Sequence, residues 1–385
     1  MRIVHVSDCY APRTGGIESQ VRDLARSQVA AGDEVHVLTA TPGIDGHHEP
    51  SDPPEDDGGV QVHRLGTAVP FDLPVNPAAP PRMRQILRTV RPDVVHVHAG
   101  LVSPFAFDGA RVAVDLGLPV AVTWHCMLDG AVSALRAAAG VTGWGTAPLA
   151  LSAVSRAAAR RVEAVFGREV AVVPDGIDLA GWAPTASPRA AGPTSHRPLR
   201  AVSTMRLAPR KRGPALVDVV ARAAAALPPG ALVLDIVGDG PSRSTIERRV
   251  RHRELDHVVH LRGRVPRAEL PALYAAADVF VAPARLEAFG IATLEARTAG
   301  LVVVARQGTG AEEFVTSEED GLLVADDDAM AAALVRLATE PALLERLRAT
   351  ALERRPVHGW EHTAQAARAE YARAQELRGQ VLPVH

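Results

Sequence analysis

The sequence has little cysteine and almost no lysine. Its two cysteines, Cys9 and Cys126, each lie in an apolar, strand-like segment, which gives neither a disulfide framework nor a metal-binding spacing. Both are therefore expected to be small buried residues. Among 42 basic residues the chain has a single lysine, Lys211. Arginine has replaced lysine everywhere else, so either an amine is required at this position or it has survived by chance.

An excess of charge and a long apolar run are also missing. The formal net charge is −2, so no global positive field would hold a nucleic acid, and no nucleic-acid partner is expected. No segment reaches the ~20 apolar residues that span a bilayer, and the N-terminus lacks the pattern of a signal peptide. The sequence therefore predicts a cytoplasmic protein, with peripheral contact to the inner membrane surface left open.

The length of 385 residues suits two α/β domains of ~150 residues or more each. Both halves alternate short β-branched runs with alanine-rich helical stretches, which is typical of parallel sheets covered on both faces. In the first half the predicted strands are Arg2–Ser7, Glu34–Thr39, Val94–His98, Val120–His125 and Val170–Pro174. In the second half they are Leu199–Thr204, Leu232–Gly238, Val258–Arg262, Val279–Pro283, Leu301–Ala305 and Leu322–Ala325.

Two stretches interrupt this alternation. Residues 42–80 are rich in Pro, Asp, Gly and His, and they predict a mobile loop region with at most a short strand near Val60–Leu65. A loop of that length is a candidate lid over an acceptor substrate. Residues 182–198 carry repeated prolines and no apolar periodicity, as an interdomain linker does. The predicted boundaries are a first domain over 1–182, a linker over 183–198, a second domain over 199–355 and a C-terminal helix over 356–385 that packs back toward the first domain.

Ligands of parallel sheets bind at the carboxyl ends of the strands, so the loops that follow the strands are the candidate sites. The first strand leads into a loop with adjacent glycines, Gly15 and Gly16, where backbone amides at a helix start can approach an anion or a sugar. A plain tight turn explains the two glycines equally well.

The loop Thr204–Gly213 follows the first strand of the second half and begins a helix. Arg206 and Lys211 could converge there on a diphosphate and stabilise its charge as it departs. The alternative is a solvated basic helix start. We favour the diphosphate, because cations are unfavourable at the positive end of a helix dipole unless an anion is present.

The segment Glu287–Glu295 follows the strand Val279–Pro283 directly. Gly290 fits a sharp turn into a helix whose exposed amides would face a phosphate, and Glu295 lies one turn beyond Ile291, where it could bind a ribose hydroxyl pair. Glu287, before the turn, would reach a sugar. Two glutamates at this spacing are usually just exposed acids, so the spacing alone does not decide.

Together these residues resemble the family 4 retaining glycosyltransferases, whose GT-B fold has two facing Rossmann-like domains. The resemblance covers nearly the whole chain. Where the family usually has asparagine, this chain has Asp175. The motifs that carry the resemblance are Gly15-Gly16, Val173-Pro174-Asp175-Gly176-Ile177-Asp178, Arg206, Lys211, Val237-Gly238-Asp239-Gly240-Pro241, the Glu287–Glu295 pair, Gly310-Ala311-Glu312-Glu313 and Asp320-Gly321-Leu322-Leu323-Val324.

The resemblance implies transfer of a hexose or related sugar, with retention of configuration, from a nucleotide-diphosphate sugar to an acceptor hydroxyl. The donor would be GDP-mannose or a UDP-sugar, and the acceptor a glycolipid, a polysaccharide precursor or a small glycoside. In the first domain, Gly16 would contact the donor, and Gly15, Gly16 and His125 the acceptor. In the second, Arg206 and Lys211 would hold the diphosphate, Glu295 the ribose, Glu287 with Phe289, Gly290 and Ile291 the transferred sugar, and the backbone near Arg264 and Val265 the base. The implied catalytic residues are His125, Glu287, Arg206 and Lys211.

No aspartate cluster with metal spacing stands at the donor loops, so no obligatory metal or other cofactor is expected. Asp326-Asp327-Asp328 is predicted to cap a helix. His96 and His98 alternate with valines on one face of a strand and are predicted to be core residues or to lie behind the site. The arginine-rich run Pro81–Arg91 could rest on an anionic membrane, although an ordinary solvated helix is the simpler interpretation.

Three other functions stay open. A dinucleotide-dependent oxidoreductase would need a third glycine that Gly238–Arg243 lacks. A related sugar-nucleotide enzyme such as a 2-epimerase would share the fold. A non-catalytic nucleotide-sugar-binding partner subunit would be expected to have lost some of the implied site residues, and none is missing.

Overall fold

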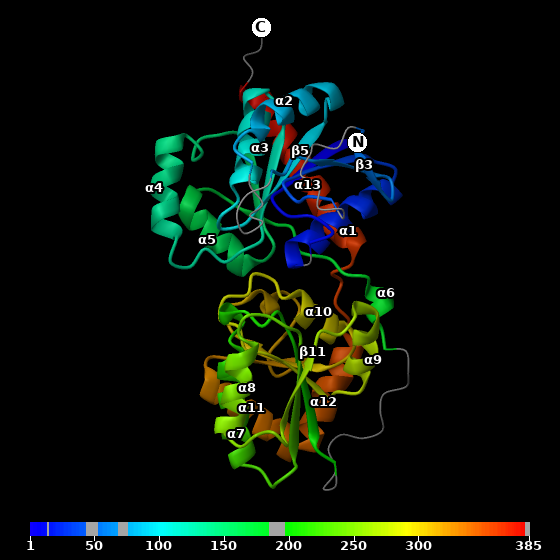
Figure 1. Cartoon of the computed structure of the whole chain (residues 1–385), viewed down its shortest axis with the longest axis vertical. Coiled ribbons are helices and arrows are strands. Elements are labelled where there is room, and N and C mark those ends of the chain that lie inside the picture. The colour runs from blue at the N-terminus through cyan, green and yellow to red at the C-terminus, as the bar shows by residue number, and fades with distance from the viewer. Residues whose placement is uncertain (14, 44–52, 68–75, 185–196, 382–385) are drawn as a thin grey trace. The chain divides into compact units, whose positions relative to one another are not determined.

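The computed structural model describes residues 1–13, 15–43, 53–67, 76–184 and 197–381. The chain forms two compact units, one from Met1–Gly176 with His358–His385 and the other from Ile177–Val357 (Figure 1). The short segment from Ile177 to Trp182, which the sequence-based boundary placed in the first domain, thus belongs to the second unit. Most of the predicted linker, residues 185–196, lies outside the described residues.

The first unit is built on an eight-stranded sheet in the order β3-β4-β2-β1-β5-β6-β7-β8, in which every pairing is parallel except β3 with β4. Six of the strands were predicted within a residue or two, whereas β3 and β7 were missed. The strands are β1 (Arg2–Ser7), β2 (Glu34–Thr39), β3 (Glu55–Asp57), β4 (Val60–Arg64), β5 (Val94–Ala99), β6 (Val120–Trp124), β7 (Leu149–Ala153) and the two-residue β8 (Ala171–Val172).

Helices cover both faces of this sheet. On one face the C-terminal helix α13 packs Ala367, Tyr371 and Ala374 against small apolar side chains of four strands, beside α1. On the other face lies α3, where Gly109 comes so close that a Cβ atom on it would be 2.6 Å from Val6. The helices are α1 (Gly16–Ala30), α2 (Ala79–Val90), α3 (Pro104–Asp115), α4 (Val132–Thr142), α5 (Arg156–Phe166) and α13 (Trp360–Val381).

The second unit has a six-stranded parallel sheet in the order β11-β10-β9-β12-β13-β14, which is the Rossmann strand order. Helices α7, α8 and α11 pack over one face, and α6, α9 and α10 lie on the other (Figure 1). The strands are β9 (Leu199–Thr204), β10 (Leu232–Val237), β11 (Val259–Gly263), β12 (Val279–Ala282), β13 (Val302–Arg306) and β14 (Gly321–Val324). The helices are α6 (Leu179–Trp182), η2 (Pro209–Lys211), α7 (Gly213–Ala225), α8 (Arg243–His252), η3 (Arg267–Glu269), α9 (Leu270–Ala275), α10 (Ile291–Thr298), η4 (Gly310–Glu313), α11 (Asp327–Thr339) and α12 (Pro341–Glu353).

Two expectations from the sequence need correction. Residues 42–80 hold more regular structure than a loop region with one short strand: β4 confirms the predicted strand, but β3 and the start of α2 also lie there; residues 44–52 and 68–75 of that stretch lie outside the described residues. The two cysteines are half-buried rather than buried, and neither forms a disulfide. Within the described residues, no helix is both long and apolar enough to cross a membrane.

A buried ion pair joins three elements of the second unit. Arg297 of α10 is 1% exposed, and its guanidinium lies 2.8 Å from the Asp320 carboxylate. The same guanidinium donates to the carbonyl oxygens of Ala351 and Arg354, at 2.5 and 2.8 Å, and so holds the end of α12. Every one of these partners is buried or at a helix end, where water cannot replace the arginine easily.

We therefore expect Arg297→Ala to destabilise the protein by about 3–5 kcal/mol, because it leaves the Asp320 carboxylate buried without its partner. Arg336→Ala is the matched control, since Arg336 forms an ion pair with Glu318 at the surface and should contribute about 1 kcal/mol or less. Urea unfolding of both variants measures the difference. Equal destabilisation by the two substitutions would contradict the role given to Arg297.

Candidate functional site

The strand order of the second unit reverses between β9 and β12. Their neighbours continue in opposite directions from this point, to β10 and β11 on one side and to β13 and β14 on the other. In open parallel sheets, ligands bind outside the carboxyl ends of the strands at such a reversal. β9 ends at Thr204 and β12 at Ala282, so the loops that carry Arg206, Lys211 and Glu287 begin together at this edge.

The structure brings two of these side chains into direct contact. The Lys211 ammonium forms a short ion pair with the Glu287 carboxylate, across 76 residues of sequence. Both side chains remain about a quarter exposed, at 23% and 24%. Arg206 is exposed, and among the described residues its side chain makes no hydrogen bond or ion pair. The loop therefore carries an exposed guanidinium, Arg206, and a lysine that Glu287 neutralises.

The loop that carries Arg206 rests on two glycines of the next loop. A Cβ atom on Gly238 would lie 1.9 Å from the carbonyl oxygen of Met205, and one on Gly240 would lie 2.7 Å from that of Leu207. Backbone bonds close the contact, with the amide of Leu207 donating to the carbonyl of Asp239 at 2.9 Å. The two glycines thus allow backbone to pack on backbone, which explains the motif without a dinucleotide.

A second close approach fixes the segment that contains Glu287. Gly290 adopts φ 96° and ψ 60°, a left-handed conformation that glycine tolerates, and α10 begins at the next residue, Ile291. Gly310 packs against this segment, and its amide donates to the carbonyl of Glu287 at 2.9 Å. A Cβ atom on Gly310 would lie 2.2 Å from the carbonyl oxygen of Ala288. The free amides at the start of α10 are thereby held at the same edge as Lys211.

Glu295 lies in the second turn of α10 and is 6% exposed. Burial raises the pKa of its carboxyl to about 7, against the opposing effect of Arg267, whose guanidinium lies 3.0 Å away. Arg267 also lies over the ring of Trp182, 5.9 Å from its centroid. Sequence reasoning missed Arg267, although it follows Arg264 and Val265 in the same loop; Arg264 is exposed and Val265 half-buried.

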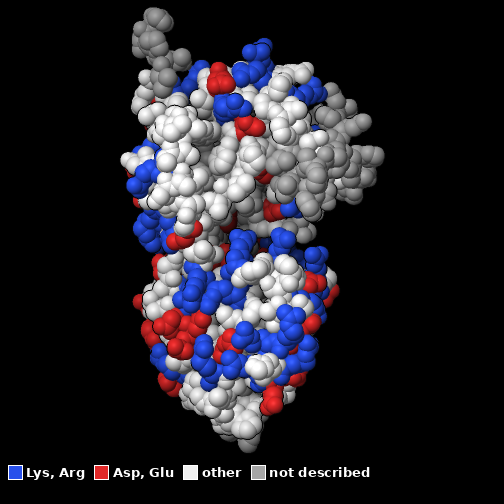
Figure 2. All heavy atoms as spheres, turned by 60° about the vertical axis from the view of Figure 1, so that its left-hand side comes forward, with Lys and Arg blue, Asp and Glu red and all other residues white. Residues whose placement is uncertain are grey.

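Basic side chains are numerous on the second unit. Figure 2 shows one face of the molecule, on which Lys and Arg side chains of this unit gather densely among fewer acidic ones. Near the candidate site two of the acidic residues are already engaged: Asp326 caps α11 by accepting from the amide of Ala329, as predicted, and Asp327 pairs with Arg212 at 2.7 Å. A surface of this kind attracts anionic ligands.

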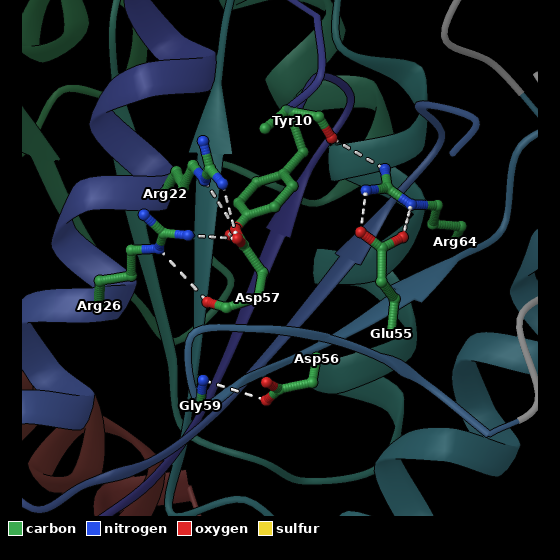
Figure 3. Close-up of polar contacts among 9 residues, drawn as sticks. Tyr10, Arg22, Arg26, Glu55, Asp56, Asp57, Gly59 and Arg64 are labelled. Carbon is green, nitrogen blue, oxygen red and sulfur yellow. Dashed lines mark hydrogen bonds and ion pairs between the residues drawn. The ribbon is translucent and has the colours of Figure 1, made fainter. Parts of the chain in front are cut away.

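In the first unit, the glycine loop after β1 is anchored by the β3–β4 hairpin (Figure 3). Arg64 of β4 donates to the carbonyl of Ala11 at 2.9 Å and pairs with Glu55 at 2.6 Å. Tyr10 donates through its hydroxyl to Asp57 at 2.9 Å. α1, which starts at Gly16, is tied to the same hairpin. The sequence predicted only a short strand near Val60–Leu65 in this stretch and missed β3, so it did not reveal this anchor.

Asp57 is the centre of this anchor (Figure 3). It accepts two hydrogen bonds of 2.7 Å from Arg22 and another from Arg26, both on α1. Burial raises the pKa of Asp57, but the hydrogen bonds from Arg22, Tyr10 and Arg26 outweigh it and hold the pKa at about 2. The Glu18 carboxylate lies against Gly15 at the start of the same helix. A Cβ atom on Gly15 would be 2.2 Å from one of its oxygens.

His125 follows β6 directly and belongs to a chain of buried histidines. Its Nε2 atom lies 3.0 Å from Nδ1 of His98, and its Nδ1 atom lies 3.4 Å from a carboxylate oxygen of Asp175. His96 and His98 are buried, as predicted for core residues. Nitrogen atoms of His5, His96 and His98 lie within 4.8 Å of one another, yet each ring nitrogen of the three already has a hydrogen-bond partner. The trio is therefore a hydrogen-bond network and not a ready set of metal ligands.

A basic groove of about 510 Å³ lies between α2 and α3, far in sequence from the other sites. Arg84, Arg88 and Arg111 line it, with Asp115 paired to Arg84 at 3.0 Å. The apolar face of α2 is buried, and the opposite face is polar, with Gln85, Arg88 and Thr89 exposed. The buried residues are Ala79, Met83, Ile86 and Leu87.

Comparison with known proteins places both units in one family. Residues 14–180 match the family model described as Glycosyltransferase Family 4, and residues 189–354 match the one described as Glycosyl transferases group 1. The chain is 32% identical over 360 residues to the GDP-mannose-dependent alpha-(1-6)-phosphatidylinositol monomannoside mannosyltransferase of Mycolicibacterium smegmatis, with 87% of this chain and 89% of the relative covered. It is 30% identical over 369 residues to a GDP-mannose-dependent alpha-mannosyltransferase of the same organism, with 88% and 89% covered.

Solved structures share the fold along the whole chain. Sucrose-phosphate synthase from Thermosynechococcus elongatus superposes with a TM-score of 0.73 at 22% identity, over 96% of this chain and 98% of that one. The Anabaena protein HepE, in complex with UDP, gives a TM-score of 0.71 at 19% identity, over 97% and 100%. These likenesses confirm the GT-B fold expected from the sequence. The chain belongs to the group 1 glycosyltransferases of family 4.

Proposed function

We propose that this glycosyltransferase transfers mannose from GDP-mannose to a hydroxyl of a phosphatidylinositol-type glycolipid, with retention of configuration. The ion pair of Lys211 with Glu287, beside the free guanidinium of Arg206, is the observation that carries the proposal for the donor site. The choice of GDP-mannose and of a glycolipid rests on the names of the relatives, which are mannosyltransferases that use GDP-mannose.

The ion pair gives the two residues complementary roles. A donor diphosphate would compete with Glu287 for the Lys211 ammonium, because it carries more negative charge. Glu287 would then be released to accept hydrogen bonds from hydroxyls of the sugar. Arg206, Lys211 and the amides at the start of α10 would stabilise the charge on the leaving diphosphate, so that no strong base is needed to drive the departure.

Glu295 and Arg267 would complete the nucleotide site. A buried carboxylate can accept both ribose hydroxyls, and Arg267 would orient it and favour its ionised form against the effect of burial. The backbone near Arg264 and Val265, one turn before Arg267, would lie against the base. We propose that the reaction needs no divalent ion, since Asp326 and Asp327 of the aspartate cluster are engaged in capping α11 and in pairing with Arg212.

Removal of the Lys211 amine tests the donor site. We expect Lys211→Ala to lower kcat by about 10²–10³-fold, because one charged donor to the leaving diphosphate is lost. Arg210→Ala is the control, since Arg210 is exposed and adjacent in sequence but carries no role in the proposed site; it should change kcat by less than about threefold.

The assay compares GDP-mannose with UDP-glucose and other sugar nucleotides in the presence of a phosphatidylinositol acceptor. Transfer from a UDP-sugar alone would overturn the donor assignment. Conversion of the donor without any acceptor would indicate an epimerase. Binding of GDP without turnover, in a folded protein, would indicate a non-catalytic partner subunit.

A pH series tests the part of the site around Glu295. The carboxylate accepts hydrogen bonds from both ribose hydroxyls only when it is ionised, and burial raises its pKa to about 7. We therefore expect the affinity for GDP to rise about tenfold between pH 6 and pH 8. Glu295→Gln is the control: it should bind GDP weakly at both pH values. Any pH dependence of its affinity comes from ionisation of the GDP phosphate. An identical slope in the two proteins would remove Glu295 from the site.

We also propose a peripheral contact of α2 with an anionic membrane surface. The buried apolar face of α2 excludes insertion of that face into lipid, so the contact would be electrostatic, through Arg88, Arg91 and the basic groove. Each arginine near an anionic surface contributes about 1 kcal/mol. A glycolipid acceptor would be reached from such a surface.

Reversal of two charges tests this contact. We expect Arg88→Glu with Arg91→Glu to weaken binding to vesicles that contain phosphatidylinositol by at least tenfold, with an effect that salt reduces. Arg248→Glu with Arg251→Glu on α8 is the matched control, because it reverses two exposed charges on a helix of the other unit. Sedimentation with vesicles measures both. An equal loss of vesicle binding in the two double variants would show that net charge causes the effect, and it would contradict a specific role of α2.

A further inference from the structure

One face of the first sheet changes from apolar to polar along its strands. Near their amino ends, Ile3, Val94, Ala121 and Ala150 pack under α13. Side chains two residues farther on point to the same face, because strand residues alternate. These are the buried polar residues His5, His96, Thr123 and Ser152, followed by His98 and His125.

Five of the polar side chains on this face form a continuous chain. Gln28 Oε1 lies 2.7 Å from His5 Nε2, and His5 Nδ1 lies 2.9 Å from His98 Nε2. His98 Nδ1 lies 3.0 Å from His125 Nε2. The chain ends where His125 Nδ1 faces the Asp175 carboxylate at 3.4 Å. It thus runs from α1 across β1 and β5 to the end of β6 and the segment after β8.

The donors and acceptors of neutral imidazole allow the hydrogen bonds of this chain to point in only two ways: all toward Asp175 or all toward Gln28. A neutral ring has one donor nitrogen and one acceptor nitrogen, so the tautomer of one ring decides that of the next. An ionised Asp175 only accepts, which puts the proton of His125 on Nδ1. His98 and His5 must then also carry their protons on Nδ1, and the Gln28 amide nitrogen must face His5.

The opposite direction requires one more proton. If Gln28 presents its oxygen to His5, then His5, His98 and His125 all donate through Nε2. His125 can satisfy Asp175 at the same time only by carrying a proton on Nδ1 as well, which makes it an imidazolium. The orientation of an amide and the tautomers of histidines are assigned from such networks. In the first arrangement His125 is neutral, and in the second it carries one more proton.

Burial keeps the extra charge at that end. Desolvation lowers the pKa of His5 to about 4 and the pKa of His98 and of His96 well below the ordinary value. The groups that face His125 are His98 and His96 of β5 and the Asp175 carboxylate. Gln20 of α1 and Thr363 of α13, both uncharged, line the small cavity of about 10 Å³ beside it.

We propose that Asp175, His98 and His5 are positioning residues for His125: the Asp175 carboxylate fixes the proton of His125 on Nδ1, and the hydrogen bonds of the chain then fix the tautomers of His98 and His5. The branch from His96 to Tyr371 and Thr123, at 2.9 and 2.7 Å, joins the chain at Gln28, whose amide nitrogen lies 2.9 Å from the Tyr371 hydroxyl. The consequence of this positioning for sugar transfer rests on the proposed function, in which His125 lies near the reacting sugar. The coupling of the ring tautomers does not rest on it.

The test uses long-range ¹H–¹⁵N spectra of the ¹⁵N-histidine-labelled full chain, which report which nitrogen of each ring is protonated. At neutral pH we expect Nδ1–H in His125, His98 and His5. Mixed tautomers along the chain, or Nε2–H in any one of the three rings, would overturn the proposal.

Two variants sharpen the test. Asp175→Asn places an amide that can donate or accept at the end of the chain, so it should yield both tautomers of His125, and of His98 and His5 with it. Ser7→Ala is the control, because Ser7 is buried on β1 but its hydroxyl donates to the carbonyl of Cys9, outside the chain; it should leave the three rings unchanged.

Discussion

The close approach of backbone to backbone at the carboxyl ends of β9, β10 and β12 is the constraint on which the second unit depends. The loop with Arg206 lies on Gly238 and Gly240, and the loop with Glu287 lies on Gly310. A side chain at any of these glycines would overlap a carbonyl group or a Cα atom, and the loops would separate. Since the strand order reverses between β9 and β12, the same packing brings basic and acidic side chains to one edge.

The charges at this edge are unevenly paired. Lys211 is neutralised by Glu287 and Asp327 by Arg212, whereas Arg206 has no side-chain partner among the described residues. A diphosphate would gain an immediate partner in Arg206 and a second one by exchange with Glu287. The pairing keeps two charged side chains ordered and oriented before a ligand arrives, which reduces the entropy that binding must overcome.

In the first unit, several polar side chains are buried on one face of the sheet and need hydrogen-bond partners. His5, His96 and His98 lie under α1 and α13, where unpaired nitrogens would be costly. Each ring nitrogen has a partner, and Gln28 and Tyr371 close the network from the covering helices. The β3–β4 hairpin anchors the neighbouring glycine loop in the same way, through Asp57 and Arg64. Polar side chains thereby hold the carboxyl end of the sheet, and apolar side chains hold the amino end.

The sequence by itself determined the family, the enzyme class, the fold and most of the strands, because β-branched runs and ordered motifs are local signals. β7 was missed since Leu-Ala-Leu-Ser-Ala has no β-branched residue, and β3 since Glu-Asp-Asp is acidic. Only the tertiary structure decided which charges meet. The pairs of Lys211 with Glu287 and of Glu295 with Arg267, and the chain from Gln28 to Asp175, join residues that are far apart along the chain. Such contacts depend on strand order and helix placement, which no local pattern of residues encodes.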